Sequence, residues 1–297
     1  MIGRLDDWQR RHRVPGFVWA VTRKYLDDGG PREAALITYY GFLSLFPALL
    51  LGVAVVSRAL TTRPGLRQEV VGAFVPPSLR ADVDAAVAAL PTSSAALVVG
   101  LIGLAYTASG VVMSAYATLN HVAAVPHRRR SGLISWYLRV LAGLAVLLTG
   151  VVTATLLPAA GTFVAAFTVL QLVAWLLLDR PAPLRALWPA GLIGATGVTL
   201  LLKLGAVVLP GLIRRAGPIY GGFATVAAVF TLLYLLSNVL VLAAEVAAVR
   251  WGRLWPRALD GSRPAPADLR AYELLRKEQE RLPEPPGPAG TTPLPGR

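Results

Sequence analysis

The sequence contains no cysteine, few charged side chains and only three histidines. Without cysteine, disulfide bonds, thiolate nucleophiles and cysteine-ligated metal sites are excluded. His12, His121 and His127 do not stand at metal-binding spacings from acidic residues. Walker, Gly-x-Ser-x-Gly and dinucleotide-binding motifs are missing as well. We therefore expect no catalytic residues, no metal site, no cofactor and no enzymatic activity.

Charged residues make up 15% of the 297 residues, whereas about 25% is usual in a soluble protein. Four long segments lack Asp, Glu, Lys and Arg altogether: 34–57, 85–127, 140–178 and 216–244. A helix that crosses a bilayer needs about 20 mainly apolar residues. The 39 residues of the third segment therefore have to fold back, and we expect a tight turn at Leu157–Gly161.

This pattern predicts an all-α, polytopic membrane protein with six transmembrane helices. They are expected at Ala34–Val56, Ala95–Thr118, Trp136–Leu157, Gly161–Leu178, Leu187–Leu209 and Phe223–Val249. Of the loop and terminal lysines and arginines, 21 lie in the two termini and the second and fourth loops, and six lie in the remaining loops. Because an excess of Lys and Arg marks the cytoplasmic face, we expect both termini in the cytoplasm and the chain in the inner (plasma) membrane.

Three regions are expected along the chain. Residues 1–33 form a cytoplasmic amphipathic segment, residues 34–251 form the transmembrane domain, and residues 252–297 form a cytoplasmic tail. The transmembrane domain includes an external loop at 58–94, in which amphipathic stretches predict short surface helices. The net charge of +13 is assigned to this topology and to anionic headgroups rather than to nucleic acid.

The two terminal regions carry helical patterns of their own. Residues 3–28 predict an interfacial helix or a pair of helices with Phe17, Val21 and Tyr25 on one face; a solvated basic terminus is the alternative. In the tail, residues 268–282 predict a charged helix with Asp268 as its N-cap. Its thin apolar stripe is expected at Leu269, Tyr272, Leu275 and Gln279, and disorder is expected from about residue 283.

Polar side chains inside the predicted spans are the first functional candidates, because they are costly in lipid. Lys203 and Glu245 lie toward opposite ends of the fifth and sixth spans, so each acts in a pathway or anchors its helix end. Asn238 lies near the middle of the sixth span, where its amide must find a partner on another helix. Helix packing is the alternative to a functional role for Asn238.

The first span holds a proline. Tyr40, Ser44 and Pro47 share one face at helical spacing. Because Pro47 frees the carbonyl of Leu43, we expect a bend there and a hydroxyl, from Ser44 or Ser109, close to that carbonyl. The bend either borders a crevice used by an amphiphile or serves packing alone.

The longest motif of the chain is REAALITYYGFLSLFP at 32–47, which includes Thr38 and Tyr39. It is similar to the first-helix signature of the YihY/BrkB family of bacterial inner-membrane proteins, once labelled ribonuclease BN. Shorter motifs that resemble those of the family include Asn120, the segment 219–223 with Tyr220 and Gly221, and 243–245 ending in Glu245. Ala243 and Ala247 stand where the family commonly has Gly and Asn. The resemblance covers about residues 17–251 and implies six helices and a role at the cell envelope.

Three functions compete at this point. The first is a transporter or flippase for lipids or other amphiphiles that has no ATPase of its own. The second is a non-catalytic envelope scaffold or assembly factor. The third, RNA hydrolysis, requires a metal-binding His/Asp cluster that the sequence lacks. The expected partners are membrane lipids, with a homo-oligomer or envelope proteins as further possibilities and no specific nucleic acid.

Overall fold

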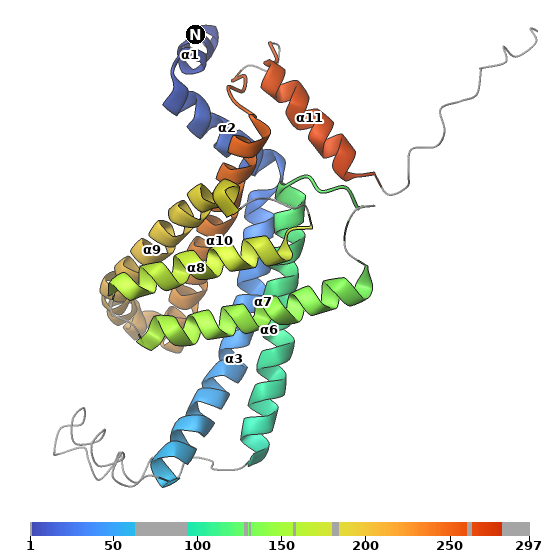
Figure 1. Ribbon diagram of the computed structural model, residues 1–297. Coiled ribbons are helices and arrows are strands. Elements are labelled where there is room, and N and C mark those ends of the chain that lie inside the picture. The colour runs from blue at the N-terminus through green and yellow to red at the C-terminus, as the bar shows by residue number, and fades with distance from the viewer. Residues whose placement is uncertain are drawn as a thin grey trace, which may run out of the picture. The chain divides into compact units, whose positions relative to one another are not determined.

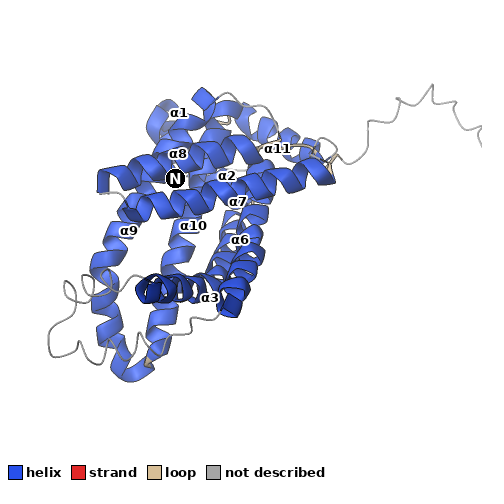
Figure 2. Cartoon of the chain, turned by 60° about the horizontal axis from the view of Figure 1, so that its bottom comes forward, coloured by secondary structure: helices blue, strands red, loops and turns tan. Residues whose placement is uncertain are grey.

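The computed structural model describes residues 2–62, 94–127, 130, 132–156, 159–179, 184–259 and 263–280. Over these residues the chain is helical and contains no strand (Figure 2). Most of the predicted external loop, part of the predicted turn after the third span, and the tail beyond residue 280 lie outside the described residues. Those predictions stay untested, as do the predicted region boundaries.

The described helices follow the predicted segments closely (Figure 1). They are α1 (Ile2–Arg11), α2 (Arg13–Asp27), α3 (Gly30–Thr62), α6 (Ser94–Val122), α7 (Leu133–Leu156), α8 (Ala159–Leu177), α9 (Leu184–Tyr220), α10 (Gly222–Gly252) and α11 (Pro266–Glu278). Helices α3, α6, α7, α9 and α10 are long and apolar enough to cross a membrane. In α8 the apolar stretch Gly161–Leu177 is shorter.

The fifth predicted span is longer than expected. It was predicted to end at Leu209, but α9 continues through Pro210 and Pro218 to Tyr220. Exposed apolar side chains such as Leu212 and Ile219 line this extension. In lipid an exposed backbone must satisfy its own hydrogen bonds, which favours a continued helix over a loop. A single residue, Gly221, then separates α9 from α10, and its positive φ of 54° suits glycine.

The chain divides into two compact units, one formed by residues 36–112 and the other by residues 1–35 and 113–297. In the larger unit α8 lies between α7 and α9, and α10 packs along α9 (Figure 1). In the smaller unit α3 and α6 approach closely at glycines of α6. A Cβ on Gly110 would lie 2.2 Å from the Tyr40 ring, and one on Gly103 would lie 3.1 Å from Pro47. Glycine is therefore required where these helices touch.

The hydroxyl prediction for Pro47 is wrong. Helix α3 runs through Pro47 without interruption. The Ser44 hydroxyl donates to the Gly41 carbonyl at 2.7 Å, and the Ser109 hydroxyl donates to the carbonyl of Ala105. Neither reaches Leu43, because a serine in a helix bonds back to carbonyls three or four residues before it.

The N-terminal segment forms two helices, and α2 packs on α10. Val21 of the predicted face joins a buried cluster with Ala20, Val249, Leu254 and Ala271. The prediction of a pair of helices is therefore confirmed, and Val21 is neither at a membrane surface nor solvated. The face predicted to meet the membrane surface instead contacts α10 and α11, because those helices offer it a dry apolar partner.

In the tail, α11 begins two residues earlier than predicted, at Pro266. Asp268 is therefore not the N-cap: it is the third helical residue, and its carboxylate accepts the N–H groups of Ala265 at 2.8 Å and Ala258 at 2.9 Å. The thin apolar stripe is not the packed face of the helix, since Leu269 and Tyr272 are exposed. The alanines of α11 lie inward instead, because a small side chain fits the close contact with α2 and α10.

Candidate functional site

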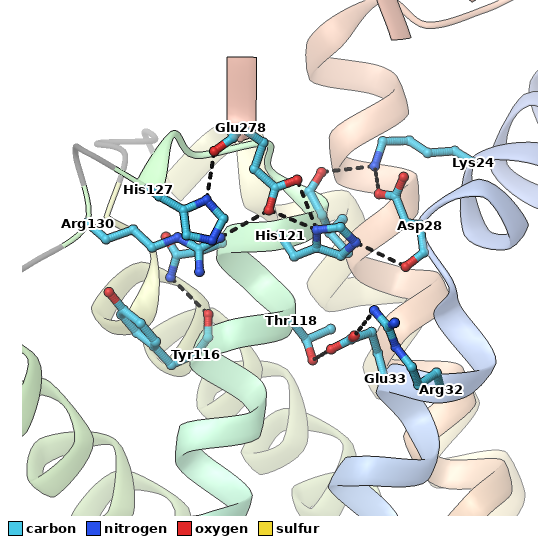
Figure 3. Close-up of polar contacts among 12 residues, drawn as sticks. Lys24, Asp28, Arg32, Glu33, Tyr116, Thr118, His121, His127, Arg130 and Glu278 are labelled. Carbon is cyan, nitrogen blue, oxygen red and sulfur yellow. Dashed lines mark hydrogen bonds and ion pairs between the residues drawn. The ribbon is translucent and has the colours of Figure 1, made fainter. Parts of the chain in front are cut away.

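The larger unit contains a buried cluster of charged side chains where α2, α6, α10 and α11 meet. At its centre is the ammonium of Lys24, which donates to the Val122 carbonyl at 2.9 Å. The same ammonium lies 3.0 Å from Glu245 Oε2 and is hydrogen-bonded to the carboxylate of Asp28 (Figure 3). Lys24, Asp28 and Glu245 are all buried.

The sequence of α2 brings Lys24 to this position. Lys24 follows Phe17 by seven residues and Val21 by three, so it lies on the apolar face of the helix. Asp28 comes four residues after Lys24, within reach of its side chain. Burial opposes the charge of the ammonium, but the carboxylates of Glu245 and Asp28 outweigh this and hold the pKa of Lys24 above its ordinary value.

Glu245 has an unusual environment for a carboxylate. Its side chain is fully buried, with 0% exposed. Lys24 is its counter-ion, with Nζ at 3.0 Å from Oε2. Apart from Lys24, neither carboxylate oxygen has a partner in the described part of the chain. The prediction that Glu245 faces protein rather than lipid is correct, and its partner comes from α2 rather than from another span.

Asn238 lies two helical turns before Glu245 and also contacts α2. Its side-chain oxygen accepts the hydroxyl of Tyr25, and its amide donates to the Tyr234 carbonyl at 2.7 Å. The expected partner on another helix is therefore present. Tyr25 and Lys24 are adjacent in α2, so two neighbouring polar contacts hold α2 against α10.

The second half of the cluster is built around His121 of α6 and Glu278 of α11 (Figure 3). His121 Nδ1 lies 2.9 Å from the Glu278 carboxylate, and Nε2 lies 3.0 Å from the Asp28 carbonyl. Because both ring nitrogens face acceptors, His121 has to be the doubly protonated imidazolium to satisfy them. Arg130 pairs with Glu278 at 3.1 Å. His127 Nδ1 lies 2.7 Å from the Glu278 carbonyl, so α11 is fastened to the end of α6.

The charges of the cluster balance. Three carboxylates, from Asp28, Glu245 and Glu278, face three cations, from Lys24, Arg130 and imidazolium His121. The six side chains come from α2, α6, α10, α11 and the segment after α6. The cluster therefore joins both ends of the chain to the apolar helices, and gain or loss of one proton would leave it unbalanced.

Asn120 occupies a separate polar junction between α6 and the end of α8. Its amide donates to the carbonyls of Tyr116 and Leu177, each at 2.9 Å, and its oxygen accepts the Asp179 N–H at 2.9 Å. The carboxylate of Asp179 is in turn paired with Arg139 at 2.6 Å. Asn120 is fully buried with its hydrogen bonds satisfied, as expected for a residue that positions helices.

The other predicted positions lie elsewhere. Lys203 and Tyr220 are exposed and make no polar side-chain contact with the described residues. Gly221 forms the turn before α10. In the smaller unit Thr38 is buried and Tyr39 is 55% exposed, with its ring edge-on to Tyr40 at 5.1 Å.

The sequence reasoning missed five of the six charged side chains of the cluster and identified Glu245 alone. Lys24, Asp28, His121, Arg130 and Glu278 lie in segments that were assigned to the membrane surface, to turns and loops, or to the charged tail helix. A signal was present for Lys24, which interrupts the apolar face of α2. A signal was also present for Arg139, a charge inside the third predicted span.

A groove of about 630 Å³ runs between α7 and α8. It is lined by small, branched and hydroxyl side chains: Ala145, Val146, Thr149, Gly150, Thr153, Gly161, Val164, Ala165, Thr168, Val169 and Leu172. The helices come close at one point, where a Cβ on Gly150 would lie 2.3 Å from Val169. Thr149 and Thr168 are exposed, and their hydroxyls make no hydrogen bond within the described chain.

Neither place has the donor set of a metal site. Within the described ranges, no three His, Asp or Glu side chains converge so that they could hold a metal ion. What the described residues offer chemically is a buried cluster of balanced charges and an apolar groove with two exposed threonine hydroxyls.

The family model described as "Virulence factor BrkB" matches residues 21–267, from the second half of α2 to the start of α11. No curated protein and no solved structure matches the chain.

Proposed function

The chain belongs to the BrkB family and is a multi-pass membrane protein; on this premise we propose that it binds a lipid or other amphiphile and moves it across the inner membrane. The proposal includes six spans, in which α8 crosses the membrane in addition to the five longer apolar helices. Both termini lie in the cytoplasm. With no nucleotide-binding motif in the sequence, the movement is passive or driven by a gradient. It also includes the absence of ribonuclease or other enzymatic activity.

The groove between α7 and α8 carries the proposal. Its volume of about 630 Å³ falls in the range of roughly 300–1,000 Å³ typical of ligand sites. It lies on apolar helices, so the molecules that reach it from the side are lipids. An acyl chain fits the apolar walls, while the unsatisfied hydroxyls of Thr149 and Thr168 offer hydrogen bonds to the polar groups of an amphiphile.

Reconstitution tests this function. The purified protein is placed in liposomes that carry a fluorescent phospholipid in both leaflets, and a membrane-impermeant quencher reports exchange between them. We expect faster exchange than in protein-free liposomes. Filling the groove with Ala165→Leu, or removing its hydroxyls with Thr149→Val and Thr168→Val together, should lower the rate several-fold.

Thr196→Val is the matched control. Thr196 is an exposed threonine of α9 whose hydroxyl donates to the carbonyl of its own helix at 2.8 Å. This change removes a hydroxyl outside the groove and should leave the exchange rate unchanged. Exchange no faster than in empty liposomes would refute the proposal. Equal loss in the control and in the groove variants would remove the groove from it.

An envelope scaffold is the second candidate, favoured by exposed apolar side chains on the terminal helices. Leu5 and Trp8 of α1 and Leu269 and Tyr272 of α11 are each more than half exposed. As a docking surface they would serve a partner rather than a lipid pathway. The double change Leu269→Ser and Tyr272→Ser separates the two functions: a scaffold loses its function in cells, while lipid exchange in liposomes persists.

A further inference from the structure

Lys24 has several polar partners and Glu245 has one, and this difference points to proton exchange at Glu245. An ammonium has three N–H donors. In Lys24 the Val122 carbonyl and the Asp28 carboxylate already engage two of them. Glu245 has no partner besides Lys24 in the described chain, although both of its oxygens are buried. A buried carboxylate with a single partner is costly, and either its counter-ion or a bound proton removes that cost.

We propose that Glu245 is a proton-binding site whose occupancy controls how firmly α2 is held on α10. A proton from water adds to the Glu245 carboxylate and gives the neutral acid. Lys24 keeps its own charge and stays bound to Asp28 and to the Val122 carbonyl. The cluster gains one positive charge, and the ion pair between α2 and α10 is lost.

The contacts that remain are weaker and separable. After protonation, the polar bond between these helices is that of Tyr25 to Asn238, next to apolar packing of Val21 on Val249. Helix α2 therefore loosens without detaching. The N-terminal segment, which α2 connects to α3 through Asp28 and Gly29, becomes free to shift its position.

Other titratable groups face the same site and have to be distinguished from Glu245. From α2 these are Lys24, Asp28 and Tyr25, and from α6 it is His121. Glu278 of α11 pairs with His121, and Arg130 pairs with Glu278. Arg250, which lies on α10 itself, is exposed. His121 loses its proton as the pH rises, whereas Glu245 gains one as the pH falls. Acidification therefore changes the charge of Glu245, whereas alkalinisation changes the charge of His121.

This inference does not need lipid transport to occur. For transport against a gradient, the inference rests on the proposed function and identifies the proton as the coupling ion. The readout below measures α2 and Glu245 directly. A pH-dependent α2 in a protein that moves no lipid would leave the proton site standing and refute the proposed function. Lipid exchange with an unresponsive Glu245 would do the reverse.

Because the sequence contains no cysteine, introduced cysteines are the only sites that a thiol-reactive spin label modifies. Val18→Cys on the exposed face of α2 and Trp251→Cys on α10 carry spin labels in the full-length protein in lipid nanodiscs. Distances between the labels are measured from about pH 8 to about pH 5, a range over which buried carboxyl groups titrate. We expect a narrow distribution at high pH and a broader, longer one at low pH.

Three further variants identify the group. Glu245→Gln should give the broad distribution at every pH, and Glu245→Asp should restore the pH response. His121→Gln should retain the broadening at low pH, because Glu245 is intact. A distribution that ignores pH, or a low-pH response that survives in Glu245→Gln, would overturn the proposal.

Infrared difference spectroscopy gives a second measurement that does not depend on how far α2 moves. Lowering the pH should produce the carbonyl band of a buried protonated carboxyl group in the wild-type protein. The band should be absent in Glu245→Gln. If no such band appears in the wild-type protein, Glu245 does not bind the proton and the proposal fails.

Discussion

Lys24 and Glu245 form an ion pair at 3.0 Å between an N-terminal helix and the last apolar helix of the chain. Both side chains are more than nine-tenths buried. Removing one partner of such a pair leaves an uncompensated buried charge, which is far more damaging than removing both. The pair therefore links the stability of the apolar helices to the attachment of α2.

Lys24→Met should lower the free energy of unfolding by about 3–5 kcal/mol at alkaline pH, where Glu245 keeps its charge. The double variant Lys24→Met with Glu245→Met should recover most of this loss, because no buried charge remains. Thermal unfolding in detergent measures both. Lys277→Met, which removes an exposed partner of Glu273, is the control and should cost no more than about 1 kcal/mol. Equal effects of Lys24→Met and the control would contradict this account.

Asp268 should make stability depend on pH in the acid range. Burial would raise the pKa of this carboxyl, but the Ala258 N–H, the Arg257 guanidinium and the Ala265 N–H outweigh burial and hold it below its ordinary value. A carboxyl with a lowered pKa in the folded state stabilises the protein above its unfolded pKa of about 3.9. That contribution disappears as the pH falls through the lower folded value.

The comparison of the wild-type protein with Asp268→Asn tests this sign. Asp268→Asn should be less stable at neutral pH, and the difference should shrink as the pH is lowered below about 4. Arg257, which is buried and also pairs with Asp27 at 2.9 Å, remains in the variant. A stability difference that grows on acidification would show that the sign is wrong.

Close approach of α3 and α6 predicts an intolerant glycine. Gly110→Ala places a methyl group 2.2 Å from the Tyr40 ring and should cost about 1–3 kcal/mol through overpacking. Gly41→Ala is the matched control on the same pair of helices, because a Cβ there meets nothing within 4 Å. Adding Tyr40→Leu to Gly110→Ala should restore part of the loss. Comparable melting temperatures for the two alanine variants would rule out this contact.

The proposed topology is open to reporter fusions. Fusions after Arg130 and after Arg297 should report the cytoplasm, and a fusion near Asp84 should report the outside, since 21 lysines and arginines lie on one side and six on the other. These fusions also test whether α8, the shortest apolar helix, crosses the membrane. A cytoplasmic reporter at Asp84 would reverse the model.

Sequence and structure agree best where local rules apply. The apolar runs located the long helices to within a few residues at most ends, because a backbone in lipid must form its own hydrogen bonds. The exception is the end of α9: the fifth span was predicted to end at Leu209, but the helix continues past Pro210 and Pro218 to Tyr220. Asn238 and Glu245 were identified correctly as polar groups that find partners in the protein, because each interrupts an apolar segment. Asn120 was singled out only by the family resemblance.

Their partners could not be found in the same way. Lys24 and Glu278 lie near opposite ends of the chain, and each is ordinary in its own segment: a lysine in a basic helix and a glutamate in a charged one. Lys203, which was an equally strong candidate in its predicted span, is exposed and makes no polar side-chain contact in the described structure. The amino-acid sequence by itself determined the membrane class, the helix positions and the presence of costly buried polar groups, since these follow from hydropathy and backbone hydrogen bonding. The tertiary structure alone decided which charges meet, because an ion pair forms when packing brings two distant helix faces within about 4 Å, and no local pattern encodes that distance.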